Sequence, residues 1–420
     1  MLTNPTRRDY FSVTIFYLAP SFFWAAMLLV VLQKRIEAFV PAAALPRSMD
    51  LIVNAGGIVS ILTQVIIGAI SDRHRGQYGR RRPFMVAGVL LSVPAIWLFA
   101  LAGNWPMLVV SFMLLQLFVN VAHGPYQALI PDMIPPERHG MASGYMGLWQ
   151  LVGQVGSLAL AAVLFSGVLG PHGMAYLFAA FTALFVGLML VTVLGVREAP
   201  YTGPELRKRD AMLAILRTDL KGNPSFCWVL VSRFLINLGF YTALLYLKWY
   251  LEFALRVPKA RVDALTLVMA LVVTVTGLAG TMPAGRLADR ISKKRIIYGT
   301  CGLCVVAAAL FWAATGLPLA MAAAAVFGLG LGAFAAVDWA LACNVLPEGD
   351  AAKFLGIWTI SFVLPQMAAA FVGHLTVAAF IGPLGPAGAY RAVFASIVPF
   401  MALGILAVSR VREREVTSRR

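Results

Sequence analysis

The chain alternates long apolar runs with short polar segments. An α-helix needs about 20 apolar residues to cross the roughly 30 Å hydrocarbon core of a bilayer, and twelve runs approach or exceed that length. They cover residues 10–32, 49–71, 83–103, 105–130, 141–168, 173–195, 225–252, 263–288, 296–315, 317–343, 354–378 and 388–409. The pattern predicts an all-α membrane protein with twelve transmembrane helices.

Composition supports this fold class. Of the 420 residues, 60% are hydrophobic and 12% are charged, and a water-soluble domain of this composition would leave a large apolar surface exposed. The first run follows TRRDYF and lacks a small-x-small cleavage pattern, so it is expected to be a retained helix rather than a secretory signal. We expect a multi-pass protein of the cell membrane, in bacterial terms the inner membrane.

The basic residues are distributed unevenly between the predicted loops. The formal net charge is +16, which taken alone could suggest a nucleic-acid partner. If both termini are cytoplasmic, however, 25 of the 34 Lys and Arg residues lie on the cytoplasmic side and eight on the external side. This asymmetry follows the positive-inside rule. We therefore expect cytoplasmic termini and no nucleic-acid binding, with anionic membrane lipids as secondary partners.

Cysteines offer little chemistry. Cys227, Cys301, Cys304 and Cys343 all fall within apolar runs, and the CGLC motif at residues 301–304 is interpreted as helix packing. We expect no disulfide, no metal and no cofactor.

The two halves of the chain repeat one design. GAISDR at residues 68–73 matches GRLADR at residues 285–290, each at the predicted cytoplasmic end of the second helix of its half. Pro135 and Pro347 stand at a second pair of equivalent positions. The repeat predicts six-helix bundles over residues 1–196 and 224–420, joined by a cytoplasmic linker at 197–223 with an amphipathic stretch near 211–220.

These repeated loops resemble the signature loop of the major facilitator superfamily. Within it, GGIVSILTQVIIGAISDRHRGQYGRRRPF and GPYQALIPD resemble the corresponding stretches of plant sucrose transporters and their bacterial and animal relatives, the glycoside-cation symporter branch. The resemblance implies a secondary transporter that works by alternating access and carries a small polar solute, most simply a sugar or glycoside.

The acidic residue of each loop is expected to contribute to a gate. Asp72 lies at a helix C-terminus, where the helix dipole disfavours it, so it needs a partner elsewhere. Neighbouring arginines and the N-terminus of the eleventh helix near Lys353 are the candidates, and Asp289 is expected to contact the fifth helix near Met141. The gating candidates are Asp72, Arg73, Arg80, Arg81, Asp289 and Arg290. The alternative is that most of Arg75 and Arg80 to Arg82 only fix topology and bind lipid headgroups.

Polar residues on the cavity-lining helices are the candidate substrate ligands. Superfamily architecture places the first, fourth, seventh and tenth helices around the central cavity. Gln116, Asn120, His123 and Gln127 share one face of the fourth helix, as do Arg233, Asn237 and Tyr241 of the seventh. The substrate-binding candidates are Trp24, Asn120, His123, Gln127, Arg233, Asn237, Tyr241, Asp338 and Trp339. Amides and aromatic rings suit a neutral polyhydroxylated ligand.

Arg233 and Asp338 are expected to form a buried ion pair, because a lone charge at this depth is costly. The pair is either a static bridge or part of the substrate or coupling machinery, and Asp338 and His123 are the proton-coupling candidates.

The sequence also departs from the family pattern. Gln116 and Gln127 stand where sucrose transporters carry a carboxylate and an arginine, and Gln64 stands where melibiose-type symporters carry an aspartate. A symporter, an uncoupled uniporter and an exporter of drugs or other metabolites therefore all stay open. We expect no enzyme, because His123 has no acidic neighbour at helical spacing, and we expect a monomer.

Overall fold

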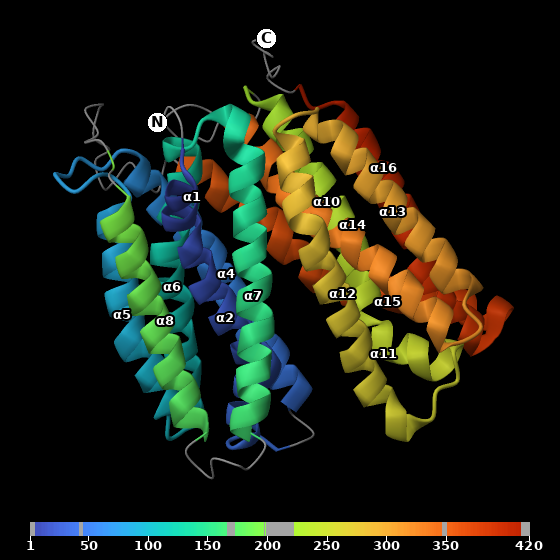
Figure 1. The fold of residues 1–420 in the computed structure, drawn as a ribbon. Coiled ribbons are helices and arrows are strands. Elements are labelled where there is room, and N and C mark those ends of the chain that lie inside the picture. Colours follow the sequence, from blue (N-terminus) through green and yellow to red (C-terminus); the bar gives the residue numbers. More distant parts are fainter. Residues whose placement is uncertain are drawn as a thin grey trace. The chain divides into compact units, whose positions relative to one another are not determined.

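The structure is a computed structural model that describes residues 5–41, 45–165, 173–196, 198, 222–346 and 351–412. Each of the twelve predicted membrane runs is helical over most of its described residues (Figure 1). The all-α fold is therefore confirmed. The amphipathic stretch predicted near residues 211–220 lies outside the described residues.

The first predicted span is not one regular helix. It is built from α1 (Arg7–Thr14), a 3₁₀ turn (Ile15–Tyr17), α2 (Leu18–Ala26), a π-helical segment (Met27–Val31) and α3 (Leu32–Glu37). Thr6 and Asp9 form a reciprocal capping box that begins α1.

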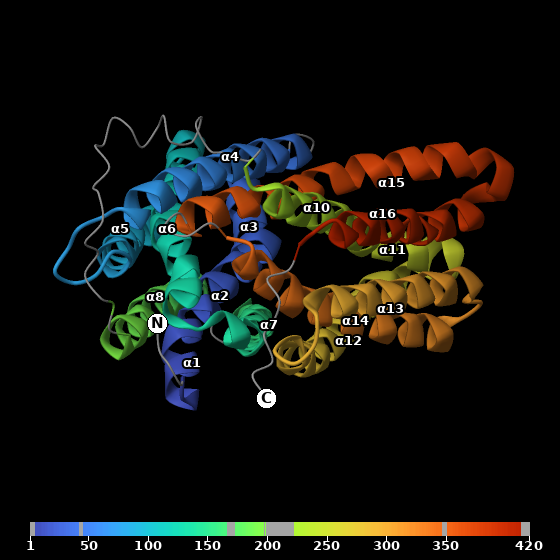
Figure 2. The same ribbon diagram turned by 90° about the horizontal axis from the view of Figure 1, so that it is seen from above.

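The rest of the first half contains five long helices. They are α4 (Leu45–Asp72), α5 (Arg82–Ala100), α6 (Trp105–Met133), α7 (His139–Phe165) and α8 (Gly173–Gly195). Both α5 and α6 carry a proline in their first turn, where the missing amide costs no hydrogen bond. Helix α5 packs against both α6 and α8 (Figures 1 and 2).

The second half repeats the arrangement. It contains α10 (Pro224–Leu245), the short α11 (Leu247–Trp249) with a π-helical segment (Tyr250–Ala254), α12 (Lys259–Ala288), α13 (Lys293–Ala313) and α14 (Leu317–Asn344). The chain continues through α15 (Ala351–Ala395) and α16 (Ile397–Ser409). Helix α15 contains a break at Gly385, whose φ of 66° places it in the left-handed region that favours glycine.

Nine stretches of the described chain are helical, long and apolar enough to cross a membrane. The longest of them, Ala351–Ser409, contains the last two predicted spans. The first span and α7 are the two predicted crossings outside these nine stretches. The protein is a multi-pass membrane protein.

Contacts divide the chain into two compact units. One consists of residues 1–135, 148–218 and 346–359, and the other of residues 136–147, 219–345 and 360–420. The first turns of α15 thus belong to the unit that contains α4, and the first turns of α7 belong to the unit that contains α12.

Glycines let these helix starts approach their partners closely. A Cβ on Gly68 of α4 would lie 2.5 Å from the carbonyl oxygen of Ala352, and one on Gly356 of α15 would lie 2.8 Å from the backbone of Gln64. In the other unit, a Cβ on Gly285 of α12 would lie 2.5 Å from the carbonyl oxygen of Gly140. Only glycine fits at these positions without a backbone shift.

Candidate functional site

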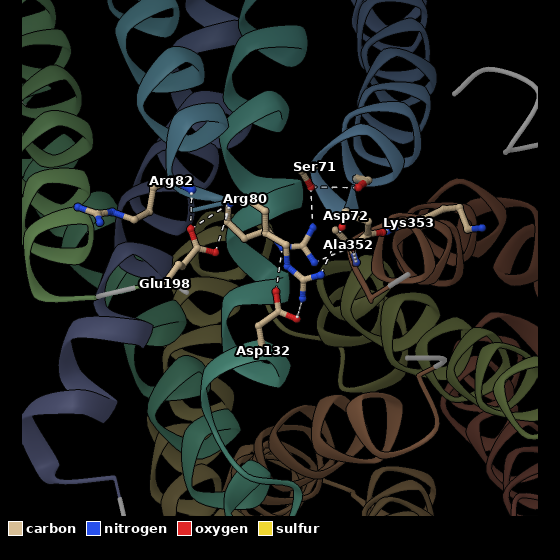
Figure 3. Close-up of polar contacts among 10 residues, drawn as sticks. Ser71, Asp72, Arg80, Arg82, Asp132, Glu198, Ala352 and Lys353 are labelled. Atoms are coloured by element: carbon tan, nitrogen blue, oxygen red, sulfur yellow. Dashed lines mark hydrogen bonds and ion pairs between the residues drawn. The ribbon is translucent and has the colours of Figure 1, made fainter. Parts of the chain in front are cut away.

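Asp72 is fully buried at the end of α4 and accepts hydrogen bonds from the first turn of α15 (Figure 3). Its Oδ1 accepts from the amide of Ala352 at 3.0 Å and its Oδ2 from the amide of Lys353 at 2.9 Å. The carboxylate therefore occupies the positive end of the α15 dipole, which compensates for its unfavourable place at the end of α4.

Arg81 joins Asp72 to the end of α6. Its Nη2 donates to Asp72 Oδ1 at 2.6 Å, its Nε to Asp132 Oδ2 at 2.9 Å, and its Nη1 to Ser71 Oγ at 2.7 Å. The Arg81 side chain is fully buried, so it is unavailable to lipid headgroups. Although burial acts in the opposite direction, the carboxylates of Asp132 and Asp72 raise the pKa of Arg81 above its ordinary value.

Arg80 and Glu198 extend the network on either side (Figure 3). Arg80 pairs with the other oxygen of Asp132 and also donates to the Asp72 carbonyl at 3.3 Å. Glu198 accepts from the amides of Arg81 and Arg82 at 3.0 and 3.1 Å, which places a carboxylate at the N-terminus of α5. Burial raises the pKa of Glu198, although these amides and Arg81 act in the opposite direction.

Asp289, the counterpart of Asp72, contacts the first turn of α7. It accepts from the amide of Gly140 at 2.7 Å and from that of Met141 at 2.9 Å. Lys293 and Arg138 act on it electrostatically. Burial raises the pKa of Asp289 to about 6, which shows that desolvation outweighs the two amides and the two cations. Asp72 and Asp289 thus contact their helix starts with similar geometry. The charged residues around them differ, because Asp72 pairs with Arg81, whereas Lys293 and Arg138 act on Asp289.

The structure places the remaining gating candidates differently. Arg73 is half-buried and Arg290 is exposed, and neither guanidinium belongs to the contacts given above for Asp72 and Asp289. Asp132 and Glu198 were not among the sequence candidates. Asp132 closes the GPYQALIPD motif, but no spacing rule connects either residue to the arginine loop.

An amide cluster forms on the polar face of α6. Gln64 of α4 donates from its Nε2 to Asn120 Oδ1 at 2.7 Å, and its Oε1 accepts from Thr359 Oγ1 of α15 at 2.8 Å. Gln127 Nε2 lies 3.4 Å from Gln64 Oε1, and Asn120 Nδ2 donates to the Gln116 carbonyl at 2.6 Å. Gln64 is the centre of the cluster, whereas the sequence had marked it only as a departure from a family pattern.

His123 lies beside this cluster with an open ring nitrogen. Its Nδ1 is 3.2 Å from Gln127 Nε2, and its ring centroid is 5.3 Å from that of Tyr17. His123 Nε2 and Gln127 Oε1 are buried and have no hydrogen-bond partner among the described residues. Trp24 packs on Phe112 of α6, with ring centroids 6.1 Å apart. Buried polar atoms normally have a partner, so His123 Nε2 and Gln127 Oε1 are available to a ligand or to water.

The expected ion pair between α10 and α14 is present. Arg233 Nη1 contacts Asp338 Oδ2, and the guanidinium carbon lies 5.6 Å from the ring centroid of Phe362 on α15. The Phe362 ring also packs against Tyr241, with centroids 5.7 Å apart. Phe362 was not predicted, and no helical spacing connects it to α10.

Three further polar atoms in this unit are open. Asp338 Oδ1, Asn237 Nδ2 and Trp339 Nε1 are buried and lack a hydrogen-bond partner within the part of the chain that the structure describes. One acceptor and two donors are thus available close to, or next in sequence to, the ion pair.

Comparisons with known proteins agree with this architecture. The chain is 29% identical over 122 residues to the sucrose transport protein SUT4 of Oryza sativa subsp. indica, which covers 24% of this chain and 20% of that protein. It is 30% identical over 175 residues to solute carrier family 45 member 3 of Mus musculus, covering 37% and 32%. The matched segments thus span a third or less of these two relatives.

A third relative matches a longer part of the chain. The fujikurins efflux protein of Gibberella fujikuroi is 25% identical over 315 residues, which cover 73% of this chain and 63% of that protein.

Solved structures show the same fold. The human organic anion transporter MFSD10 has a TM-score of 0.71 at 16% identity, covering 97% of this chain and all of that one. The proton:xylose symporter XylE has a TM-score of 0.69 at 16% identity, covering 96% of each chain. The family model of the Major Facilitator Superfamily matches residues 10–369 and 260–420. With this match across nearly the whole sequence, the chain belongs to the Major Facilitator Superfamily of membrane transporters.

Proposed function

We propose that the protein carries a small neutral polyhydroxylated solute, a sugar or glycoside, across the cell membrane by alternating access. The observation that carries the proposal is the buried amide cluster on α6, with its two open atoms at His123 and Gln127. Amides both donate and accept, as a hydroxyl does, so one cluster can bind several hydroxyls without a net charge.

Each half supplies its own candidate ligands in this proposal. Asn120, His123 and Gln127 bind hydroxyls from α6, and Trp24 offers an aromatic face. In the second half the candidate ligands are Asn237, which binds hydroxyls, and Tyr241 and Trp339, which offer aromatic faces. They lie close to Arg233 and Asp338 along their helices. Aromatic faces suit the apolar side of a sugar ring.

The cluster of Asp72, Arg80, Arg81 and Asp132 acts in this proposal as a cytoplasmic gate contact, with Asp289 as its counterpart. Residues 1–196 and 224–420 are the two halves that rock, and both termini are cytoplasmic. The positive-inside distribution of Lys and Arg supports this orientation.

Export of a metabolite is the second candidate. The fujikurins efflux protein matches a longer part of this chain than the sucrose transport protein does, although at lower identity. An exporter of apolar compounds would use the aromatic residues and leave the amide cluster as a bond between helices.

A thermal-shift panel distinguishes the two candidates, because a ligand stabilises the folded state that binds it. The panel contains sucrose, maltose, aryl glucosides, sugar acids, nucleosides and lipophilic cations, tested in detergent micelles. We expect neutral sugars to raise the unfolding temperature of the wild type but not of Gln127→Ala. The matched control Gln33→Ala changes an exposed glutamine and should respond as the wild type does. Stabilisation by lipophilic cations alone would favour the exporter.

A further inference from the structure

Arg233 and Asp338 are the charged side chains that the structure buries most deeply between α10 and α14. Asp338 is fully buried and Arg233 is 7% exposed. Neither carboxylate nor guanidinium would be stable alone at this depth, so the two charges depend on each other.

The carboxylate of Asp338 is only partly engaged. Arg233 contacts Oδ2, whereas Oδ1 accepts no hydrogen bond from any residue in the described ranges. An ionised carboxylate can accept about four hydrogen bonds, and buried polar atoms normally have a partner, so a buried carboxylate oxygen without one is unusual. Oδ1 is the atom on which a proton, a water or a substrate hydroxyl would complete the site.

Arg233 has a second partner when the carboxylate is neutral. Its guanidinium lies over the Phe362 ring at 5.6 Å, and the negative face of an aromatic ring stabilises a cation. The Cys301 thiol on α13 also interacts electrostatically with Asp338. The charged residues of the described part of α12 lie at the ends of that helix.

Phe362 lies on the same helix as the residues that Asp72 contacts. It lies on α15, three residues after Thr359, which donates to Gln64 of α4. The first turn of the same helix is held by Asp72. A change in how Arg233 interacts with Phe362 therefore acts on the helix whose N-terminus forms the proposed gate.

We propose that Asp338 is the proton-coupling carboxylate of this transporter and that Arg233 is its positioning residue. A proton from water on one side of the membrane binds Oδ1, the ion pair loses one negative charge, and the same proton leaves to water on the other side. Its movement down the proton gradient supplies the work of accumulation. The inference rests on the proposed transport function and adds the driving ion.

Two measurements on the full chain in proteoliposomes test it. The first compares uptake of radiolabelled sucrose driven by a pH gradient with sucrose counterflow at equal pH. We expect Asp338→Asn to lose accumulation and to retain counterflow. The matched control Glu252→Gln also neutralises a carboxylate. Glu252 is half-buried, and its Oε1 lies 3.7 Å from Nζ of the exposed Lys259. This variant should behave as the wild type. Accumulation by Asp338→Asn against a gradient would overturn the proposal.

The second measurement needs no substrate. Infrared difference spectra between acidic and alkaline pH contain the carbonyl stretch of every carboxyl group that takes up a proton, Asp289 and Glu198 included. The Asp338 band is one component of this signal, and we expect it in the wild type and in Glu252→Gln. The band should be missing in Asp338→Asn and should persist to higher pH in Arg233→Gln, because the nearby cation is removed. If the wild type moves no sucrose, the sugar assignment fails while this band still decides the proton site. A band unchanged in Asp338→Asn would overturn the proposal.

Folding is controlled separately. Asp338→Asn leaves Arg233 as a buried cation, which can prevent folding. The double variant Arg233→Gln/Asp338→Asn removes both charges, and it should lack the same band and the same accumulation. A double variant that keeps either one would also contradict the role of Asp338.

Discussion

The Arg81 side chain donates hydrogen bonds to three polar groups. Its planar fork reaches Asp72, Asp132 and Ser71 at once, and a lysine ammonium at the same depth could not match that geometry. We expect Arg81→Lys to lower the free energy of unfolding by about 1–3 kcal/mol, because buried acceptors lose their donors. Unfolding in mixed micelles measures this. Arg75→Lys, at an exposed position of the same loop, should stay within about 0.5 kcal/mol of the wild type. Equal effects of the two variants would contradict the role of the fork.

Asp289 gives stability a defined pH dependence. Its pKa is about 6 in the folded protein and ordinarily 3.8, so the unfolded chain loses this proton first as the pH rises. Stability should therefore fall from about pH 4 to about pH 6 and then level off.

The difference between the wild type and Asp289→Asn isolates this group. We expect the difference in unfolding temperature to change across that window and to be constant above it. A constant difference from pH 4 to pH 7 would show that the carboxyl titrates normally when docked.

Sequence patterns identified residues whose charge is unfavourable at their position in a predicted helix. Asp72 at a helix C-terminus needed an outside partner, and the structure gives it Arg81 and the first turn of α15. Gln64 and Thr359 are 295 positions apart, and nothing in their local sequence is unfavourable. Their contact follows from helix packing, which no periodicity encodes.

At the scale of elements, the starts of α15 and α7 depend on separate carboxylates. We expect Asp72→Asn to speed hydrogen exchange of the Ala352 and Lys353 amides by roughly tenfold or more, since a hydrogen bond to a charged group is worth about 1.5–3 kcal/mol. The Gly140 and Met141 amides should be unaffected. Asp289→Asn should do the reverse, so each variant controls for the other. Parallel changes at both sites would indicate general loosening instead.

The helices themselves could be predicted from hydropathy, because each apolar run matches the bilayer thickness. The interruptions could not be. The π-helical segment at Met27–Val31 consists of apolar residues alone, and the one at Tyr250–Ala254 contains a single charged residue, Glu252, so neither sequence marks an interruption. Long-range contacts decide such irregularities, for example the hydrogen bond from the Tyr250 hydroxyl to the Phe311 carbonyl at 2.7 Å.

At the scale of the whole molecule, orientation in the membrane follows from charge. We expect Glu205→Cys to react with an impermeant thiol reagent only from the cytoplasmic side, and Lys259→Cys only from the external side, because 25 of the 34 Lys and Arg residues lie on the predicted cytoplasmic side. Both are tested in a background that lacks the four native cysteines. Labelling of residue 205 from outside would invert the topology.

Gly68 and Gly356 give a way to trap the protein. Each lies where an added methyl group would strike the backbone of the opposite helix, at 2.5 Å for Gly68 and 2.8 Å for Gly356. Gly68→Ala or Gly356→Ala should therefore keep α4 and the start of α15 apart by steric clash, without replacing any charged residue. A population held in that form is a starting point for selecting conformation-specific binders and for solving the state in which this contact is open.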